Sequence, residues 1–240
     1  MKRLFFLLSV APAALAIFSC SGAMDELPCL TCSVPQEIKY STPVEHGGKI
    51  YETIVIGTQV WFQSNLNYEP PDDVDSKCWG DDPANCEKYG RLYNWATAMA
   101  LSQICNDITC SSQITAKHKG ICPSGWHIPN GKEWDTLMVA VGGYLDADRY
   151  LKANSGWKDK DNISITYKDA YGFKALPGGR GLPGGSFFHV GSGGYWWSAN
   201  EDNTDSKKAE ILYMTSDTDE PVKWYRDEKS FLFSVRCVKN

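Results

Sequence analysis

The chain has 240 residues, enough for one substantial domain or two small ones, and a formal net charge of −5 at neutral pH. No basic stripe or run of Lys and Arg interrupts this acidic balance, which argues against nucleic-acid binding. Nine Trp, twelve Tyr and nine Cys indicate a core of large aromatic rings and disulfides rather than one of Leu and Ile.

The first nineteen residues have the layout of a secretory signal peptide. Two basic residues precede an apolar run over residues 4–17, and polar sequence follows closely. This run is shorter than the roughly 20 residues that a transmembrane helix needs. We therefore predict that residues 1–19 direct export and are removed, and that no later segment spans a bilayer.

Residues 17–20 read Ile-Phe-Ser-Cys, which resembles the end of a bacterial lipoprotein signal. A small residue precedes the obligatory cysteine, although Phe18 is larger than is usual at its position. The resemblance implies that Cys20 becomes the first mature residue and carries lipid. The lipid would anchor the chain to the bacterial outer membrane or cell surface. An ordinary signal peptide, cut nearby, is the alternative.

The other eight cysteines form an even set, which in an exported chain predicts a disulfide framework. Three pairs are close in sequence, and two of these bracket polar segments. The last two cysteines then remain for each other, in a bond that ties the middle of the chain to its C-terminus. The expected pairs are Cys29–Cys32, Cys78–Cys86, Cys105–Cys110 and Cys122–Cys237.

The CxxC of residues 29–32 also admits zinc or redox chemistry. A structural zinc site needs about four ligands, and no second CxxC or His pair is near. A redox CxxC is expected beside a βαβ pattern, whereas this one sits in a polar, Pro-containing stretch. We therefore favour a local disulfide, and the sequence predicts no metal site here.

Residues 20–45 are polar, contain several prolines and lack periodicity, so they predict a tether. The folded domain is then expected to occupy residues 46–240. It opens with two β-rich runs, 50–56 and 59–62, around Gly-Thr, which indicates a hairpin. Residues 67–88 are rich in Asp, Pro and Asn and predict a disulfide-clipped loop.

Two helices are predicted in the middle of the chain. Over residues 92–99, apolar residues recur at i, i+3, i+4 and i+7 and share one helical face. Asn130 with Glu133 forms a capping-box pattern before a second apolar stripe, which ends at Gly142-Gly143. A short third helix is expected over residues 147–153.

The rest of the chain predicts strands and loops. A short strand is expected at 171–176, and residues 177–194 contain eight glycines and predict a long irregular loop. Strand-like runs follow at 195–199, 209–215, 221–226 and 231–238. Because helices and strands form separate runs along the chain, we predict an α+β fold rather than a parallel α/β fold.

Five segments together resemble the Fibrobacter succinogenes major paralogous domain, a family of bacterial surface and secreted domains. The ordered set covers residues about 49–239, nearly all of the predicted mature domain. The segments are IGTQVW with NLNY (56–61, 65–68), YGRLYNW (89–95), CPSGWHIP with EW (122–129, 133–134), YGF with PGGR (171–173, 177–180), and YWWSA with SVRC (195–199, 234–237).

That family is similar to the superfamily of C-type lectins and formylglycine-generating enzymes. The resemblance implies a C-type lectin-like domain with two main helices, a curled antiparallel sheet and long disulfide-clipped loops. It also implies that the N- and C-terminal strands pair, and that a helix-side cysteine bonds to the last strand. The Cys122–Cys237 pair fits this arrangement.

The residues of the lectin calcium site do not match. Calcium-dependent lectins use Glu-Pro-Asn or Gln-Pro-Asp and Trp-Asn-Asp tripeptides, because the ion needs convergent carboxylates and carbonyls. Here residues 128–130 read Ile-Pro-Asn and 197–200 read Trp-Ser-Ala-Asn, with Glu201 and Asp202 out of register. We therefore expect no cofactor. A calcium ion at an acidic cluster is the alternative, at Asp72/Asp73, Asp81/Asp82 or Asp217/Asp219/Glu220.

An enzyme is not expected either. Formylglycine-generating enzymes use a reactive cysteine pair near the C-terminus, where this chain has Cys237 alone. His127 lies between Trp126 and Ile128 and is interpreted as a packed, hydrogen-bonded side chain. No other catalytic motif is present, so no catalytic residue is assigned.

The sequence therefore favours a non-catalytic binding or adhesion module that holds a glycan or a partner protein of the envelope. The long loop at 177–194 and aromatics in polar surroundings, Trp79, Trp157 and Trp224, are the candidate ligand contacts. The other tryptophans of the family segments are expected in the core. A structural cell-envelope protein without a small ligand is the alternative, and a formylglycine-generating type of enzyme comes third.

Overall fold

The computed structural model describes residues 37–71, 75–216 and 220–240. The predicted lipidation site Cys20 and the predicted pair Cys29–Cys32 lie outside these residues. Within them the chain forms short helices and mainly antiparallel sheets, which confirms the predicted α+β class. Among the described helices, none has the length and apolar character needed to cross a bilayer.

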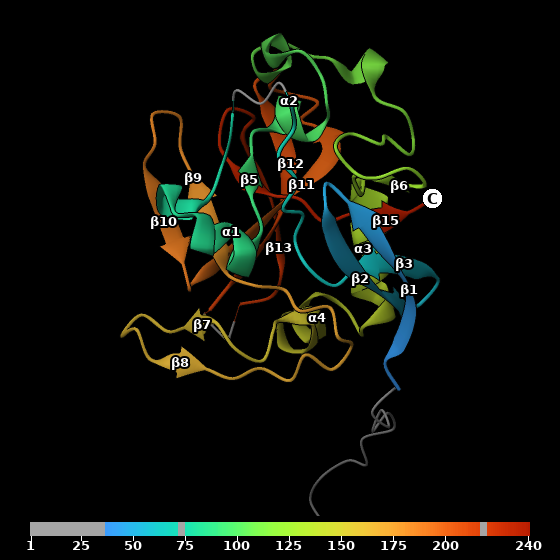
Figure 1. The fold of residues 1–240 in the computed structure, drawn as a ribbon, viewed down its shortest axis with the longest axis vertical. Helices are drawn as coiled ribbons and strands as arrows, with labels where there is room; N and C mark the ends of the chain where they lie inside the picture. The colour runs from blue at the N-terminus through green and yellow to red at the C-terminus, as the bar shows by residue number, and fades with distance from the viewer. Residues whose placement is uncertain (1–36, 72–74, 217–219) are drawn as a thin grey trace, which may run out of the picture. The chain divides into compact units, whose positions relative to one another are not determined.

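The predicted hairpin is confirmed and belongs to a five-stranded antiparallel sheet. Ile56 faces Gln59 across the turn, where Gly57 adopts a positive φ of 58° that an L side chain would disfavour. The C-terminal strand then pairs with this hairpin, so both ends of the domain meet in one sheet (Figure 1). In spatial order the strands are β1 (Lys39–His46), β2 (Lys49–Ile56), β3 (Gln59–Phe62), β15 (Val238–Lys239) and β6 (Trp126–His127).

The first strand corrects the predicted boundary between tether and domain. Residues 39–46 pair with β2 instead of belonging to a tether that runs to residue 45. The strand was not predicted because its segment contains proline and lacks periodicity. Pro43 sits where the register shifts between Ser41 and Val44, so the missing N–H falls at a bulge on an edge strand, where it is tolerated.

A six-stranded sheet forms the middle of the domain. Its strands are antiparallel except for the β11–β14 pair. In spatial order they are β13 (Lys223–Glu228), β12 (Lys208–Thr215), β11 (Gly193–Glu201), β14 (Phe233–Ser234), β5 (Leu92–Tyr93) and β4 (Ser76–Lys77). The predicted strands at 195–199, 209–215 and 221–226 thus correspond to β11, β12 and β13, whereas the run 231–238 divides between β14 and β15.

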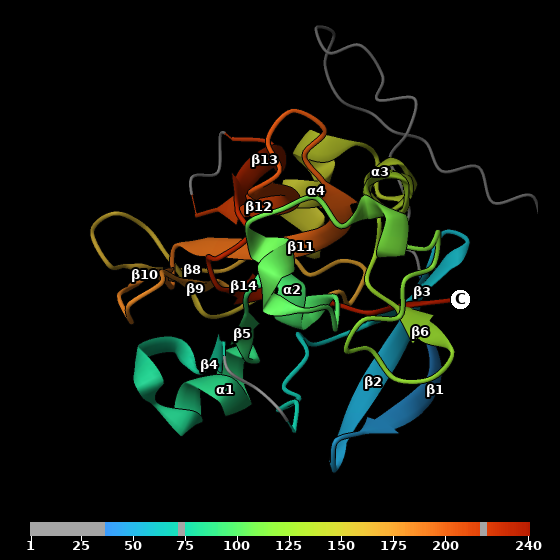
Figure 2. The same cartoon turned by 90° about the horizontal axis from the view of Figure 1, so that it is seen from above.

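Helices lie on both sides of this sheet (Figure 2). The α-helices are α1 (Pro83–Tyr89), α2 (Trp95–Ala98), α3 (Gly131–Ala140) and α4 (Tyr144–Leu151), and the 3-10 helices are η1 (Trp79–Asp81), η2 (Gln103–Asn106) and η3 (Ser111–Gln113). The predicted second helix is confirmed as α3. Its capping box is complete, because the Glu133 N–H donates to Asn130 Oδ1 over 3.1 Å and the Asn130 N–H donates to Glu133 Oε2 over 3.0 Å.

Several predicted elements were wrong. The expected helix at 92–99 begins only after Asn94, whose Oδ1 accepts a bond from Thr97 N, and Leu92–Tyr93 is strand β5 instead. The third helix starts earlier, at Tyr144, directly after Gly143. The loop at 67–88 contains α1, for which Asp82 is the N-cap and Pro83 the first residue.

The glycine-rich segment 177–194 was also mispredicted as irregular. It contains the hairpin of β9 (Gly178–Gly181) and β10 (Phe187–Val190), where Phe187 pairs with Gly181. Residues 171–176 form no strand and contribute only an isolated bridge between Ala175 and Lys152. A further small hairpin is made by β7 (Trp157–Lys158) and β8 (Ser164–Ile165).

Two aromatic cores lie on the two faces of β11. Because successive side chains of a strand point to opposite faces, Trp196 and Trp197 enter different cores. Trp197 packs with α2 and Phe233, and its Nε1 donates to Tyr93 O over 2.7 Å. Trp196 packs on the α3 side and donates to Asn65 Oδ1 over 2.8 Å. Both indoles are fully buried and have their N–H groups satisfied.

A buried arginine fastens the C-terminal segment to the rest of the fold. Arg236 is fully buried and donates through Nη2 to Asn65 Oδ1 over 2.7 Å and through Nη1 to Gln63 O over 3.2 Å. Its guanidinium carbon lies 4.3 Å from the ring centroid of Phe173. Burial lowers the pKa of Arg236 to about 9, with Asp169 acting in the opposite direction, so the group stays charged at neutral pH.

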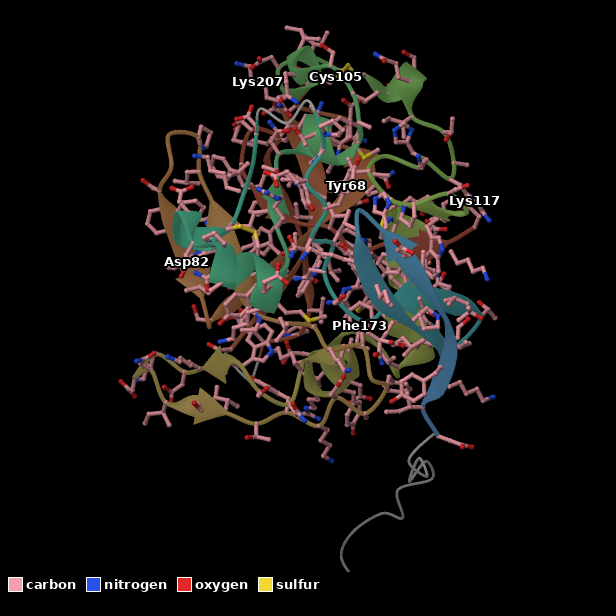
Figure 3. All side chains as sticks on the ribbon, viewed as in Figure 1. Tyr68, Asp82, Cys105, Lys117, Phe173 and Lys207 are labelled. Atoms are coloured by element: carbon pink, nitrogen blue, oxygen red, sulfur yellow. A yellow bond between two sulfur atoms is a disulfide. The ribbon has the colours of Figure 1, made fainter. Side chains whose placement is uncertain are left out.

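Three of the four expected cysteine pairs are disulfides in the structure (Figure 3). Cys78–Cys86 joins the end of β4 to α1, and Cys105–Cys110 closes a short surface loop. Cys122–Cys237 joins residues 115 apart in sequence. This long closure links the segment before β6 to the one before β15, strands that themselves pair.

Candidate functional site

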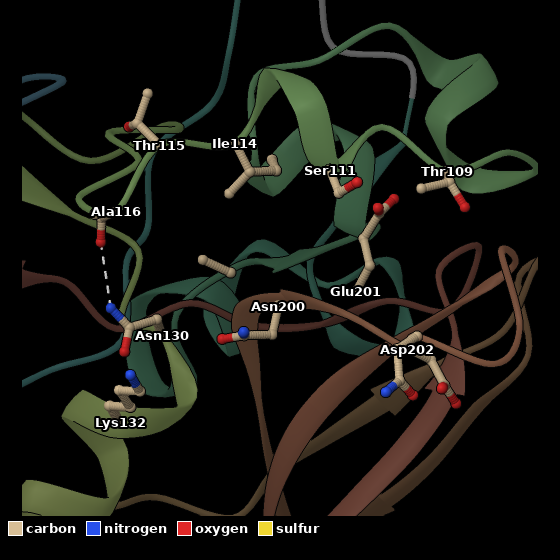
Figure 4. Close-up of a pocket in the computed structure, with 12 residues that line it drawn as sticks. Thr109, Ser111, Ile114, Thr115, Ala116, Asn130, Lys132, Asn200, Glu201 and Asp202 are labelled. Carbon is tan, nitrogen blue, oxygen red and sulfur yellow. Dashed lines mark hydrogen bonds between the residues drawn. The ribbon is translucent and has the colours of Figure 1, made fainter.

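A polar pocket of about 670 Å³ lies where three distant segments of the chain meet (Figure 4). One wall is the segment after the Cys105–Cys110 loop, the second is the start of α3, and the third is the end of β11 with the turn that follows. We call it the polar pocket. Its lining residues are Thr109, Ser111, Ile114, Thr115, Ala116, Asn130, Lys132, Ala199, Asn200, Glu201, Asp202 and Asn203.

Two asparagines connect the walls of the polar pocket. Asn130, the cap of α3, donates from Nδ2 to Ala116 O over 3.2 Å and so holds the first wall against the helix. Asn200 Oδ1 accepts from Gly131 N over 2.8 Å, and Ser198 Oγ lies 3.1 Å from the same oxygen. Within the described part of the chain, Asn200 Nδ2 makes no hydrogen bond. This amide therefore offers a fixed donor to a ligand.

A buried ion pair fixes the third wall. Lys229 is fully buried and donates to Glu201 Oε1, whose side chain is only 6% exposed. The same ammonium donates to the carbonyls of Cys105 over 3.0 Å and Ile108 over 3.1 Å, and lies 4.6 Å from the Trp95 ring centroid. Glu201 also accepts from Cys110 N over 2.9 Å. The disulfide loop is thereby held to the end of β11.

A second pocket, of about 310 Å³, adjoins the start of α3 and is here called the Trp224 pocket. Trp224 Nε1 donates to Tyr144 Oη over 2.8 Å and to Asp135 Oδ1 over 3.1 Å, and Tyr144 donates to the same carboxylate. Hydrogen bonds within the protein therefore fix the orientation of the indole. The lining residues are Gly131, Asp135, Glu210, Trp224, Tyr225 and Arg226.

Carboxylates and one guanidinium give this region its charge. Arg226 lies 3.6 Å from Asp202 and 3.7 Å from Glu210, and its side chain is 55% exposed. Burial raises the pKa of Glu210, against the effect of Arg226, and the charges of Asp202 and Asp135 reinforce the rise. Glu210 is thus held in a place that disfavours its charge, which is common where structure serves binding rather than stability.

The first prediction concerns this carboxylate. A raised carboxyl pKa means that the charged form is less stable in the folded chain than in the unfolded chain. The resulting cost is present at neutral pH and is relieved as the pH falls through the raised pKa. We therefore expect Glu210→Gln to raise the thermal midpoint at pH 7 by about 1–2 °C, a size discounted for partial exposure.

Differential scanning calorimetry at pH 7 measures this effect. Glu52→Gln, at an exposed position on β2, is the matched control and should leave the midpoint unchanged. A midpoint lowered by Glu210→Gln contradicts the prediction, because it would mean that the Arg226 contacts outweigh the burial of the charge.

The structure separates the three predicted ligand-contacting tryptophans. Trp224 lines a pocket, and half-buried Trp79 packs on the β9–β10 hairpin, with Nε1 donating to Phe188 O over 3.3 Å. Trp157 corrects the prediction, because it is fully buried and donates to Ala175 O over 2.9 Å. The polar sequence around it lies in exposed hairpin β7–β8, while the indole itself fills the core. The tryptophans expected to pack are all buried, namely Trp61, Trp95, Trp126, Trp134, Trp196 and Trp197.

The remaining sequence candidates occupy other places. His127 is fully buried, with Nε2 2.7 Å from Glu133 Oε1 and Nδ1 2.7 Å from Asn240 Oδ1, as expected for a packed side chain. The segment 177–194 lines neither the polar pocket nor the Trp224 pocket.

Of the acidic clusters predicted as possible calcium sites, Asp82 caps α1, while residues 72, 73, 217 and 219 lie outside the residues that the structure describes. In the described ranges no three His, Cys, Asp or Glu side chains gather as a metal site.

Sequence reasoning missed most of the polar pocket. Asn130 was noticed as a helix cap, and Glu201 and Asp202 were noticed as carboxylates out of register with a lectin calcium site. The segment 109–116 carries no signal beyond its polarity, and only the fold brings it to α3.

Comparison with known proteins supports the family assignment. A family model described as the Fibrobacter succinogenes major domain matches residues 54–239, most of the chain. The comparisons of this chain with curated proteins and with solved structures gave no match.

Proposed function

We propose that this chain, which belongs to the Fibrobacter succinogenes major domain family, is an exported, lipid-anchored, non-catalytic module that binds a glycan in the polar pocket. The leader sequence and the lipoprotein-like residues before Cys20 support export and anchoring. Disulfides, which form in oxidising compartments, are consistent with that location. The lipid would place the pocket at the cell surface or outer membrane.

We further propose that the domain is C-type lectin-like. The meeting of the first and last strands in one sheet supports this likeness, as does a long-range disulfide that ends beside the last strand. The calcium-coordinating tripeptides are absent from the sequence, so the glycan is held without calcium and no cofactor takes part.

The polar pocket is the observation that carries this proposal. Its volume lies in the range of small-ligand sites, about 300–1,000 Å³. Side-chain amides, hydroxyls and carboxylates line it, and these groups pair with sugar hydroxyls, which both donate and accept. Asn200, Asn130 and Glu201 are held by bonds within the protein, so little side-chain entropy is lost on binding.

A non-catalytic role fits the cysteine chemistry. Each cysteine in the described residues is part of a disulfide, so that part of the chain holds no free thiol for the nucleophilic chemistry of formylglycine-generating enzymes. Mass spectrometry of the exported chain, with free thiols alkylated before reduction, tests this point. A reactive thiol outside the lipidated position would contradict it.

The second prediction uses the Asn200 amide. In Asn200→Asp the Oδ1 acceptor for Gly131 N is kept, and a carboxylate suits the start of a helix. Only the Nδ2 donor is lost and replaced by a repelling acceptor. We expect the affinity for the glycan found on a glycan array to fall about tenfold, as for one lost hydrogen bond at the upper end of the usual range.

Asn162→Asp is the matched control for that change. It adds the same charge at the turn of the β7–β8 hairpin, where the oxygen facing Lys158 Nζ at 2.9 Å is kept. Equal losses in the two variants would contradict the assignment of the polar pocket. Failure of the unmodified chain to bind any arrayed glycan or insoluble polysaccharide above a scrambled control would contradict the glycan itself.

A further inference from the structure

We infer that the polar pocket and the Trp224 pocket are two sugar-binding positions of one groove, which takes a neutral oligosaccharide of at least two units across Gly131. The inference rests on the proposed glycan function and deepens it. It specifies the length and the charge of the ligand, neither of which follows from a single polar pocket.

Gly131 is the point at which the two pockets meet. It lines the Trp224 pocket, and the residues on either side of it, Asn130 and Lys132, line the polar pocket. A Cβ at Gly131 would lie 3.2 Å from Glu210 Oε2, 3.7 Å from Asn200 Oδ1 and 3.8 Å from Trp224 Cη2. The missing side chain therefore leaves open the space between an amide of one pocket and the indole of the other.

The backbone does not require glycine at this position. Gly131 is the first residue of α3, and its φ lies outside the positive range that excludes L side chains. Space rather than backbone conformation therefore accounts for glycine here, because a Cβ would crowd Glu210 Oε2 at the point between the two pockets. Close approach of other groups to the backbone is a common reason for glycine.

A second connection between the pockets is Arg226. Its guanidinium reaches Asp202 in the polar pocket at 3.6 Å and Glu210 in the Trp224 pocket at 3.7 Å. Both contacts are long and partly exposed, so they are weak. The guanidinium can reorient its five donors toward ligand hydroxyls at little cost. A chain of sugars crossing Gly131 would pass this donor on its way between the two positions.

The Trp224 pocket has the composition of a sugar-stacking position. One face of a pyranose ring is largely C–H, and a large indole offers it an apolar surface. Hydrogen bonds to Tyr144 and Asp135 hold this indole in place. Glu210 Oε2, which accepts no hydrogen bond from the described residues, points to the same space and can accept from a sugar hydroxyl.

The charge of the groove selects against acidic sugars. Asp135, Asp202 and Glu210 outnumber the cations that face the ligand, Arg226 and Lys132, while Glu201 is neutralised from behind by Lys229. A uronate would meet this excess of carboxylates at close range and be repelled. The structure therefore favours neutral sugars.

The experiment measures affinity against oligomer length by isothermal titration calorimetry with the full chain after signal-peptide removal. The probes are glucose, mannose and galactose oligomers of one to six units, beside galacturonic acid oligomers. We expect at least one neutral series to gain tenfold or more in affinity between one unit and three. The galacturonic acid series should bind at least tenfold more weakly than the preferred neutral series.

Two variants probe the second position by independent means. Trp224→Ala removes the stacking surface, and Gly131→Ala inserts one methyl group between the pockets while favouring the helix. Each should abolish the gain with length and leave the affinity for the single sugar within about twofold. Val139→Ala, on the same helix at a side chain that is 77% exposed and lines neither pocket, should leave the gain intact.

The outcomes separate the two proposals. A gain with length that persists in both variants, or an affinity that does not depend on length, overturns the two-position groove and leaves the glycan function standing. A preference for galacturonic acid oligomers overturns the inferred neutral ligand. If no oligomer of any series binds, both this inference and the glycan function fail.

Discussion

Replacing Lys229 by Met is expected to lower the free energy of unfolding by about 3–5 kcal/mol, the usual cost of breaking a buried ion pair from one side. Four oxygens lose their shared donor: Glu201 Oε1 and the carbonyls of Cys105, Ile108 and Ser206. Met fills much of the space of the lysine stem but donates nothing. Glu201, only 6% exposed, is left as an uncompensated charge.

Urea denaturation of single and double variants measures this effect. It also separates the cost of the unpaired Glu201 charge from the cost of the other lost Lys229 contacts. Adding Glu201→Gln to Lys229→Met removes the stranded charge, so the double variant should be more stable than Lys229→Met by about 1 kcal/mol or more. Lys208→Met, which breaks a half-exposed pair with Asp205 at 3.5 Å, is the control and should change stability little. If Lys229→Met lowers the free energy of unfolding no more than the control does, apolar packing of the Met side chain can replace the ion pair.

The same substitution should weaken the proposed glycan binding in the folded fraction. The segment that follows the Cys105–Cys110 loop forms one wall of the polar pocket and Glu201 belongs to another, and Lys229 donates hydrogen bonds to both the loop and Glu201. Loss of affinity at temperatures where the variant is still folded, measured by calorimetric titration, would follow from a loosened wall. Unchanged affinity would mean that the loop keeps its place without Lys229, through contacts such as the bond from Cys110 N to Glu201.

Removing the Cys122–Cys237 disulfide by alanine at both positions is expected to cost roughly 5 kcal/mol in the chain-entropy model. The bond closes a loop of 115 residues, and its removal frees the unfolded chain across most of the domain. Both cysteines are fully buried, so lost packing adds to the effect. The measurement is the urea midpoint and slope of the variant against the unmodified chain.

The Cys78–Cys86 pair provides the control for that experiment. It closes a loop of only 8 residues, for which the same model gives roughly 2.5 kcal/mol. The long closure should therefore cost about 2 kcal/mol more than the short one. Equal or reversed losses would contradict the entropic account and place the stabilisation in local native contacts.

The sequence predicted those elements whose secondary structure depends on residues within one short segment. The capping box of Asn130 and Glu133 and the apolar stripe behind it determine α3 within one short window. The hairpin of β2 and β3 follows from runs of β-branched and aromatic residues on both sides of Gly57-Thr58. In both cases neighbouring residues supply the hydrogen bonds and the buried face, so a pattern in one segment suffices to predict the element.

Prediction from the sequence failed where pairing with distant segments determines the secondary structure. Leu92 and Tyr93 continue the apolar period of a helix, yet β14 and β4 pair with them and take them into the sheet. The glycines of 177–194 suggested irregular backbone, but β9 and β10 pair there because Gly179 has no side chain. A Cβ on Gly179 would lie 2.4 Å from Phe188 O.

The candidate site was the least predictable part of the molecule. The polar pocket draws its walls from segments about seventy residues apart at the start of α3 and the end of β11, joined by the bond between Gly131 and Asn200. No periodicity or motif marks such a junction. The prediction of a ligand contact was wrong for Trp157, whose sequence neighbours are polar although its own side chain is buried. The polarity of a segment does not indicate the direction of one side chain.

The consecutive tryptophans of β11 have a consequence for how the domain comes apart. Since Trp196 belongs to one core and Trp197 to the other, displacement of β11 would expose both cores. We therefore expect the two cores to unfold as one cooperative unit, although β11 lies between them. Binding of the proposed glycan at Asn200, at the end of that strand, would therefore stabilise both cores together.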